Sequence, residues 1–313
     1  MDKETNLKWR ERIKMPSASE MTKRKKDPKN EFYTLYETIE SEIGSYPIEV
    51  WRGKVVYCPC DASWSNFYRY FIDNFERLEL KEVIFSSVEG RYCRYKGKDV
   101  EWLEMPPDCF CSAGDFRSLF AKDLMKQADV VVTNPPFGLF LQFFEQIIGF
   151  GKEYLLICFT PIISKGATMR EILRGNLFCG NSVKAGNLTF EVCADYEKSK
   201  NVTDKNLVTF GCTWITNLPV FEKNLNDFEV GKEYIDALPR YDKFPHIINI
   251  DRIDKIPTNY DGVMGVPITY MRKYNPNKYK ILGRNGFGIE SALEIKGKKL
   301  FDRLFIQKKT SQE

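Results

Sequence analysis

The sequence predicts an α/β protein in which a doubly wound, mostly parallel sheet is covered by helices on both faces. Two observations lead to this fold class. Short apolar runs rich in β-branched residues alternate with amphipathic segments of helical period along most of the first two thirds of the chain. The chain also has 313 residues, which is enough to bury a full core in one large domain or in two of ordinary size. A sheet of this kind binds its ligands in loops at the carboxyl ends of the strands.

The expected elements begin with a helix over residues 31–43, because Phe32, Leu35, Ile39 and Ile43 share one face. After it we expect, in order, a strand at residues 54–58, a helix at 66–77, a strand at 82–86, a strand at 129–133, a helix at 140–148, a strand at 154–159 and a final strand at 207–215 that can pair antiparallel.

Charge and periodicity divide the chain into three parts. Residues 1–30 form a polar, basic arm, which either is a solvated tail or contacts phosphates. Residues 31–219 carry the alternating strands and helices. Residues 220–313 lose this period and mix basic with aromatic residues, which suits a surface facing nucleic acid or a capping subdomain with solvated lysines, and we favour nucleic acid. The residues expected to contact it are Tyr270, Arg272, Lys273, Lys278 and Arg284.

Composition narrows the class and the compartment. Hydrophobic residues make up 43% of the chain, and no apolar run approaches the roughly 18 residues that a membrane span requires. The first residues lack the basic-then-apolar pattern of a signal peptide, so we expect a cytoplasmic protein. The net charge of +4 neither demands nor excludes a nucleic-acid partner.

The nine cysteines are expected to be reduced thiols, because an odd number scattered over a long chain is not typical of a disulfide framework. Cys58/Cys60 and Cys109/Cys111 form two Cys-x-Cys pairs that a four-thiolate zinc site could use. Structural zinc sites usually space their ligands about two to four residues apart, so we expect no metal. The single histidine, His246, stands among apolar neighbours and is expected to be packed, which argues against Ser-His and Cys-His catalysis.

The most informative stretch is Asn134-Pro135-Pro136-Phe137, which follows directly on the strand expected at residues 129–133. The prolines fix φ and donate no backbone hydrogen bond, so the carbonyls here stay available as acceptors. A neutral side-chain acceptor therefore stands beside rigid carbonyls and an exposed ring. This set suits the binding of a planar exocyclic amine while the ring stacks on its base. The alternative is an ordinary strand-to-loop turn.

Two further segments indicate where a ligand with a charged tail and an adenine can bind. The first strand ends in Cys58-Pro59-Cys60-Asp61 and leads into a helix that Ser65 or Asn66 can cap. Asp61 can pair with an amine while the first NH groups of that helix face a carboxylate, and an amino acid tail carries both charges. Gly114-Asp115-Phe116 can present a carboxylate to an adenine amine at a strand end, and a glycine turn is the alternative.

Taken together, the chain resembles the EcoRI-type adenine-specific DNA methyltransferase family from about residue 30 to the C-terminus. The motifs that carry the resemblance are Glu31-Phe32-Tyr33-Thr34, Cys58-Pro59-Cys60-Asp61 with Ser65-Asn66-Phe67, Gly114-Asp115-Phe116, Asn134-Pro135-Pro136-Phe137, Thr213-Trp214-Ile215-Thr216-Asn217-Leu218 and Tyr260-Asp261-Gly262-Val263-Met264-Gly265-Val266-Pro267-Ile268-Thr269. The last two are typical of this family in particular. The resemblance implies a Rossmann-like, S-adenosylmethionine-binding catalytic domain over residues 31–219 and a DNA target-recognition region over residues 220–313.

The resemblance also implies S-adenosyl-L-methionine as the methyl donor and double-stranded DNA as the acceptor. The donor-binding residues that it implies are Phe32, Tyr33, Thr34, Cys58, Asp61, Ser65, Asn66, Asp115 and Phe116, and the catalytic residues are Asn134, Pro135, Pro136 and Phe137. One departure is that the second strand ends in Ser86-Ser87 rather than in an acidic residue, so the contact to the donor ribose stays unassigned. A monomer in a bacterial cytoplasm, on the nucleoid when bound to DNA and with a separate cognate restriction endonuclease, completes this expectation.

The expected reaction is site-specific methylation of adenine N6 in a restriction-modification or epigenetic role. Hydrogen bonds from the amine to the Asn134 side-chain oxygen and the Pro135 carbonyl would pull the nitrogen toward tetrahedral geometry and free its lone pair. The base must first be flipped out of the duplex, and Phe137 would stack on it. The alternatives are a methyltransferase for RNA adenine or for a protein glutamine side chain, and a non-catalytic DNA-binding protein on a methyltransferase scaffold.

Overall fold

The computed structural model describes residues 32–182, 187–192, 206–220, 229–285, 288–289, 293–300 and 302–309. The chain divides into two compact units, the first comprising Met1–Phe159 and Asn187–Pro219 and the second comprising Thr160–Gly186 and Val220–Glu313. The basic arm expected at residues 1–30 lies outside the described residues. Among the helices of the described segments, none is both long and apolar enough to cross a membrane.

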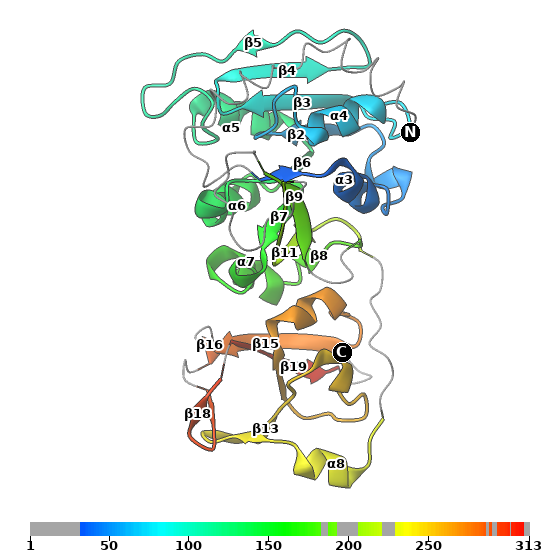
Figure 1. Cartoon of the computed structure of the whole chain (residues 1–313), viewed down its shortest axis with the longest axis vertical. Coiled ribbons are helices and arrows are strands. Elements are labelled where there is room, and N and C mark those ends of the chain that lie inside the picture. The colour runs from blue at the N-terminus through cyan, green and yellow to red at the C-terminus, as the bar shows by residue number, and fades with distance from the viewer. Residues whose placement is uncertain are drawn as a thin grey trace. The chain divides into compact units, whose positions relative to one another are not determined.

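A mixed sheet forms the centre of the first unit, with strands in the order β5-β4-β3-β2-β6-β7-β11 (Figure 1). The four central strands, from β3 to β7, run parallel, and the strands that flank them on either side are antiparallel. The predicted α/β class with a parallel sheet centre is confirmed. The strands are β2 (Val55–Cys58), β3 (Glu82–Ser87), β4 (Arg91–Tyr95), β5 (Leu103–Glu104), β6 (Val130–Thr133), β7 (Glu153–Phe159) and β11 (Cys212–Thr216).

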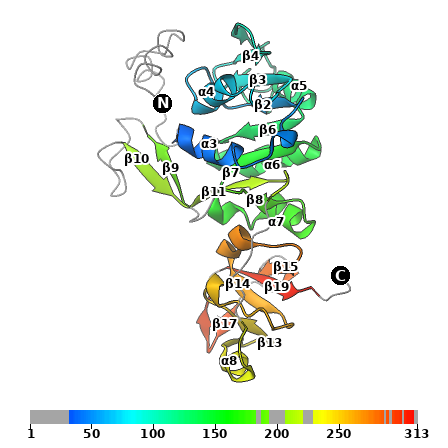
Figure 2. The ribbon, with the colours of Figure 1, turned by 90° about the vertical axis from the view of Figure 1, so that its right-hand side faces the viewer.

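Helices cover both faces of this sheet. Figure 2 shows α3 and α4 on one side of the strands and α5 and α6 on the other. Strands β2, β3 and β6 are buried along their whole length, as expected for parallel strands with helices on both faces. The helices are α3 (Tyr36–Ile43), α4 (Asn66–Asp73), α5 (Leu119–Gln127) and α6 (Phe140–Gly149), with short 3-10 turns η1 (Ile48–Val50) and η2 (Phe137–Leu139).

Local hydrogen bonds set the ends of α4. The Ser65 hydroxyl accepts a hydrogen bond from the Tyr68 backbone NH at 3.0 Å, so Ser65 is the amino-terminal cap. The helix ends at Asp73, short of the predicted residue 77, and Asn74 caps it. The Asn74 backbone NH donates to the Tyr70 carbonyl at 3.0 Å, and the Asn74 side-chain amide donates to the same carbonyl at 2.8 Å.

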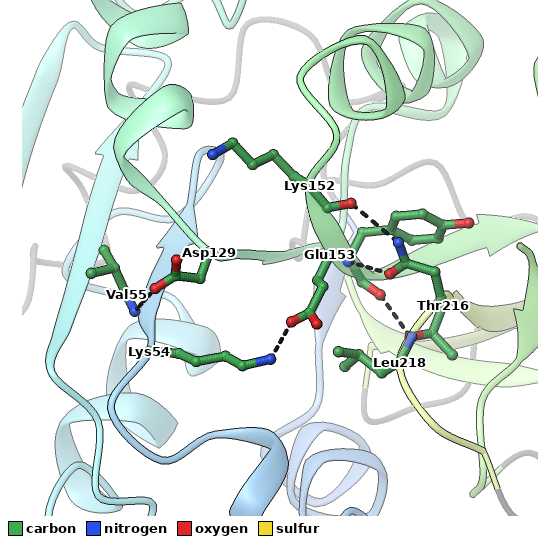
Figure 3. Close-up of polar contacts among 9 residues, drawn as sticks. Lys54, Val55, Asp129, Lys152, Glu153, Thr216 and Leu218 are labelled. Atoms are coloured by element: carbon green, nitrogen blue, oxygen red, sulfur yellow. Dashed lines mark hydrogen bonds and ion pairs between the residues drawn. The ribbon is translucent and has the colours of Figure 1, made fainter.

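The amino-terminal edge of the sheet is closed by polar contacts (Figure 3). The Val55 backbone NH donates to an Asp129 carboxylate oxygen at 2.8 Å, and the Lys54 ammonium pairs with Glu153. Where β11 ends beside the start of β7, the Thr216 hydroxyl donates to the Tyr154 carbonyl at 2.6 Å and accepts from the Leu218 NH at 2.9 Å. These groups satisfy one another, which leaves the carboxyl-terminal edge as the place for ligand chemistry.

A small second sheet joins segments that are far apart in the sequence. It has the order β1-β9-β10, from β1 (Tyr33–Thr34), β9 (Leu188–Glu191) and β10 (Leu207–Phe210). The helix predicted over residues 31–43 therefore begins only at Tyr36, because Tyr33 and Thr34 pair with β9 instead. The strand predicted over residues 207–215 is likewise divided at Gly211 between β10 and β11, and β11 pairs antiparallel with β7 as expected.

The second unit holds a six-stranded sheet in the order β12-β13-β14-β19-β15-β16. This sheet was not predicted, because its strands are short and its pairings join distant segments. Its strands are β12 (Arg240–Tyr241), β13 (Phe244–Asn249), β14 (Met264–Pro267), β15 (Tyr279–Asn285), β16 (Gly288–Ile289) and β19 (Arg303–Lys308). The other elements are η3 (Thr160–Ile162), α7 (Gly166–Leu173), β8 (Phe178–Cys179), α8 (Lys232–Ala237), η4 (Ile253–Lys255), η5 (Ile268–Lys273), β17 (Glu294–Ile295) and β18 (Lys298–Lys299).

His246 lies on β13 and is exposed, so the prediction that it is packed was wrong. The residues of β13 that follow it, Ile247 and Ile248, provide the buried contacts of this strand instead.

Candidate active site

Asn134 follows β6 directly and lies at the carboxyl-terminal edge of the parallel strands. Its side-chain amide donates a hydrogen bond to the Phe32 carbonyl at 3.0 Å. Its other side-chain atom, Oδ1, is buried and has no hydrogen-bond partner among the described residues. A buried acceptor without a partner costs folding free energy, so this oxygen is prepared for a donor that comes from outside the chain.

The two prolines hold this acceptor in place. Pro135 is buried and Pro136 half-buried, and neither has an NH that could compete for a carbonyl. The Leu139 NH donates to the Pro136 carbonyl at 3.0 Å and closes the η2 turn, which carries Phe137.

Phe137 belongs to an aromatic cluster formed by Phe32, Phe137, Phe159, Phe190 and Phe210. The Phe137 ring is nearly parallel to the Phe32 ring, with centroids 5.7 Å apart, and to the Phe159 ring, with centroids 6.2 Å apart. Phe159 keeps 36% of its surface exposed at the end of β7. Phe159, Phe190 and Phe210 were not predicted from the sequence. Of the three, only Phe159 could have been predicted, because it ends a strand that runs parallel to β6.

The segment Phe32-Tyr33-Thr34 brings two predicted groups of residues together. The Asn66 side-chain amide donates to the Thr34 carbonyl at 2.8 Å, just as Asn134 binds the Phe32 carbonyl. The Tyr33 ring packs edge-on against Trp64 at 5.1 Å. The start of α4 and the loop after β6 are therefore anchored to the same short segment.

Asp61 follows β2 and is buried, with 5% of its surface exposed. The Thr133 hydroxyl donates to its carboxylate at 2.9 Å, and the Ser65 hydroxyl is a second partner. Burial raises the pKa of Asp61 to about 7, and both hydroxyl groups oppose this effect. No cation contributes to its pKa within the described ranges, so this carboxylate has neutral partners only.

Asp115 and Phe116 are arranged differently from the prediction. Gly114-Asp115-Phe116 is a turn before α5 and not the end of a strand, since the Ser118 NH donates to the Asp115 carbonyl. Gly114 packs so closely on the Ser87 and Val88 carbonyls that a Cβ would lie 2.4 Å from the first and 2.3 Å from the second. The segment thus still reaches the end of β3, although through backbone contact.

The side chains of this turn already have partners. Arg117 binds both Asp115 carboxylate oxygens, at 2.8 Å and 2.5 Å, and this hydrogen bonding lowers the pKa of Asp115. Phe116 is 6% exposed and packs edge-on against Phe143 at 5.1 Å. Phe116 was expected to bind the donor beside Asp115, and its ring instead faces the core against α6.

Two more buried hydroxyl groups of the first unit, Thr34 Oγ1 and Ser87 Oγ, lack a hydrogen-bond partner among the described residues. They come from β1 and from the end of β3. Ser86, by contrast, is bonded to the Tyr57 hydroxyl at 2.8 Å and to the Pro59 carbonyl. Unsatisfied polar atoms at this edge fit a polar ligand.

The Cys-x-Cys pairs do not form a metal centre. Cys58 is buried and Cys60 half-buried, and burial raises the pKa of the Cys58 thiol well above its usual value and that of Cys60 to about 12. Throughout the described residues, no group of three or more His, Cys, Asp or Glu side chains could hold a metal ion.

In the second unit, the predicted nucleic-acid residues divide into exposed and buried ones. Lys273 and Lys278 are exposed. Tyr270 is completely buried, so direct contact with a partner is excluded for its ring. Arg284 donates to Asp302 at 2.7 Å, and burial lowers the pKa of Arg272, which donates to the Thr160 hydroxyl at 3.3 Å. Tyr270 was predicted wrongly because aromatic residues of a basic stretch can face either side of a turn.

Comparisons with known proteins identify the family. A family model described as "Adenine-specific methyltransferase EcoRI" matches residues 20–106 and 96–312. The Type II methyltransferase M.EcoRI of Escherichia coli is 35% identical over 318 residues, which cover 93% of this chain and 97% of the relative. The chain belongs to this family of adenine-specific methyltransferases. The EcoRI-type resemblance seen in the motifs is thus confirmed.

Two other Type II methyltransferases are similar to the chain. The Type II methyltransferase M.MpnI of Mycoplasma pneumoniae is 32% identical over 276 residues, which cover 82% of this chain and 83% of the relative. The Type II methyltransferase M.MgeORF184P of Mycoplasma genitalium is 31% identical, over 82% and 84%. No solved structure matches the chain.

The two motifs typical of the EcoRI family have structural roles here. In Thr213-Trp214-Ile215-Thr216-Asn217-Leu218, the Asn217 side chain accepts from the Tyr154 NH at 2.8 Å and donates to the Lys152 carbonyl at 3.2 Å, which ties β11 to β7 (Figure 3). In the motif at residues 260–269, a Cβ on Gly265 would lie 2.0 Å from the Tyr241 hydroxyl. Glycine is needed there because Tyr241 donates to Asn249 in the buried sheet.

Proposed function

We propose that this member of the EcoRI family is a site-specific DNA methyltransferase that methylates N6 of an adenine flipped out of a duplex, with S-adenosyl-L-methionine as donor. The observation that carries the proposal is the Asn134 side chain. Its amide is held by the carbonyl of Phe32, the residue whose ring stacks on Phe137, and its Oδ1 is buried and has no hydrogen-bond partner among the described residues. A fixed acceptor and a ring are what the recognition of an adenine amine requires.

Asn134 acts on the amine by orientation. A hydrogen bond from the amine to Oδ1, and a second one to the Pro135 carbonyl, draw the nitrogen out of conjugation with the ring and free its lone pair. Because Asn134 is neutral, it removes no proton from the amine. Its contribution is preorganised electrostatics, since the Phe32 contact fixes its side chain before the base arrives. The amine proton leaves to solvent after transfer.

The residues at the same edge fit the methyl donor. When bound, S-adenosylmethionine supplies a methyl group on a sulfonium centre. Asp61 is a buried carboxylate with neutral partners only, which fits the ammonium of the amino acid tail. The Ser65-capped start of α4 fits its carboxylate, and Asn66 holds Thr34 over the same end.

The adenosine part of the donor fits the end of β3. The Ser87 hydroxyl is buried and unpaired, and a ribose hydroxyl can satisfy it. Asp115 stays the proposed partner of the adenine amine through its Oδ2. This oxygen accepts one hydrogen bond from the Arg117 guanidinium and keeps a second lone pair, whereas Oδ1 accepts from both the Arg117 backbone NH and its Nε. Cys58, the last residue of β2, is fully buried next to Phe85 of β3, and Phe116 is buried against Phe143, so both support this end of the sheet from the core.

Phe137 is proposed to stack on the flipped adenine. Its ring now contacts Phe32 and Phe159, and these neighbours fix its orientation. Stacking on a preoriented ring lowers the cost of holding a base outside the duplex.

The second unit is proposed to hold the DNA. Lys273 and Lys278 are joined there by Lys280, which belongs to the same basic-aromatic stretch of the sequence, and by Lys308 and Lys309, which were not predicted. The pairing of Tyr279 with Lys308 and the hydrogen bond from the Lys309 NH to the Lys278 carbonyl, at 2.9 Å, bring Lys278, Lys280, Lys308 and Lys309 to one end of β15 and β19. Lysines gathered in this way suit phosphate contact. Residues 220–313 are accordingly proposed as the target-recognition region and residues 31–219 as the catalytic domain.

The proposal is tested by sequencing DNA from cells that express the protein and lack other adenine methyltransferases, with detection of N6-methyladenine. We expect one methylated sequence motif, and no methylation when Asn134→Ala is expressed to the same level. If methyl groups were found in RNA adenine or protein glutamine and none in DNA, the substrate would be RNA or protein and not DNA. A wild-type protein that binds DNA and no donor would be a non-catalytic binder. The same experiment reveals the recognition sequence, and size-exclusion chromatography tests the proposed monomer.

A further inference from the structure

The buried carboxylate of Asp61 is held from two separate elements. The Thr133 hydroxyl, on the last residue of β6, donates to its Oδ2 at 2.9 Å. The Ser65 hydroxyl, at the start of α4, is its other partner. The Asp61 NH donates to the Ser86 carbonyl at 2.9 Å, so the backbone is held as well. Thr133 is fully buried and has Asn134 as its next residue.

We propose that Thr133 is a positioning residue for the methyl donor, because its hydroxyl holds the Asp61 carboxylate in the orientation that binds the donor's ammonium group. It thereby links the strand that leads into Asn134 to the donor site. This inference rests on the proposed function, and it adds a residue that touches neither the methyl group nor the base.

The surroundings of Asp61 explain why such a group is needed. A buried carboxylate without a cation is unstable, and among the described residues the two hydroxyl donors are what stabilises it until the ammonium arrives. The titratable groups that face it are the thiols of Cys58 and Cys60, whose pKa values burial raises, so both are neutral near pH 7. The Asp115 carboxylate also acts electrostatically on Cys60, but its charge is neutralised by the ion pair with Arg117.

Removal of the Thr133 hydroxyl should change how donor binding depends on pH. Only the ionised carboxylate pairs with an ammonium, and burial raises the pKa of Asp61 to about 7. In the wild type, donor affinity should fall about tenfold for each pH unit below 7 and level off above it. Without the hydroxyl, the pKa of Asp61 rises further, so the levelling moves to higher pH.

The experiment measures the Kd of S-adenosylmethionine by calorimetry from pH 6 to pH 8.5 for the wild type, Thr133→Val and Thr133→Ser. Thr213→Val is the matched control, because Thr213 is equally buried on β11 and its hydroxyl contacts the Trp214 carbonyl instead. We expect Thr133→Val to bind the donor about tenfold or more weakly at pH 7, with recovery at pH 8.5. Thr133→Ser and Thr213→Val should stay near the wild type, and kcat at saturating donor should change little in Thr133→Val.

A second ligand separates positioning from general damage. 5′-Methylthioadenosine has the adenosine and sulfur of the donor and lacks the amino acid tail, so Thr133→Val should bind it as the wild type does at every pH. If Thr133→Val bound both ligands equally weakly at every pH, or bound the donor as Thr213→Val does, the positioning role would be refuted. If the wild type itself did not bind S-adenosylmethionine, the proposed function would fail, and this outcome is distinct from the other two.

Discussion

Replacing Asp61 by asparagine should stabilise the empty protein at pH 8 and abolish donor binding. The carboxylate is 5% exposed and has neutral hydroxyl partners only, so it carries an uncompensated charge when it ionises. Asparagine has nearly the same shape, can still accept a hydrogen bond from Thr133, and never ionises. The loss of a functional group should therefore increase stability here.

The magnitude follows from the pKa. Burial raises the pKa of Asp61 from 3.8 to about 7, and at about 1.4 kcal/mol for each tenfold change in proton affinity this corresponds to roughly 4 kcal/mol of folding free energy at pH 8. The sign is that of an acid whose pKa is raised by folding. The folded protein keeps the proton while the unfolded chain loses it, so wild-type stability falls as pH rises from about 4 to about 7 and then levels off. Between pH 5 and pH 8 the variant should gain about 2–3 kcal/mol on the wild type.

Urea unfolding at pH 5, 6, 7 and 8, followed by tryptophan fluorescence, measures this difference. All five tryptophans belong to the first unit, so the signal reports on the unit that contains Asp61. Asp99→Asn, at an exposed position of the same unit, is the control and should show a flat difference. The prediction would be refuted if the free energies of unfolding of Asp61→Asn and the wild type differed by the same amount at every pH. It would also be refuted if the variant were less stable at pH 8. Either result would mean that a group other than the two hydroxyls compensates the charge of Asp61.

Three other substitutions test the proposed roles. Asn134→Ala should lower methyl transfer by at least about 100- to 1,000-fold while donor and DNA binding stay within a few-fold, because the lost hydrogen bond strengthens in the transition state; near-normal turnover would remove Asn134 from catalysis. Asp115→Ala should weaken donor binding about 5- to 150-fold, whereas Arg117→Ala should leave it nearly unchanged, and equal losses in calorimetry would make the ion pair merely structural. Phe137→Trp should keep substantial activity, and Phe137→Ala should lose about 1–3 kcal/mol of stacking, which a mismatch opposite the target adenine should partly restore. A large fall in the Tm of Phe137→Ala, with no rescue by the mismatch, would instead place its ring in the core.

The sequence alone determined the features that depend on neighbours along the chain. The apolar runs at β2, β3, β6 and β7 predicted parallel strands, because each run is local and their order follows from the alternation with helices. The double proline after β6 predicted a rigid turn for the same reason, and the family motifs indicated the enzyme class that the comparisons confirmed. The cap at Ser65 was also predictable, since capping is settled within one helical turn.

Only the tertiary structure decided which side chains meet. The contacts from Asn134 to Phe32 and from Thr133 to Asp61 join residues 102 and 72 positions apart, and no local pattern records such pairs. The burial of Tyr270 was equally invisible, because a basic-aromatic stretch looks the same whichever face is turned inward. Sequence patterns fix secondary structure through interactions over a few residues, whereas the site depends on pairings and burial that exist only when the sheet has formed. The availability of the Asn134 oxygen is a property of that assembled state.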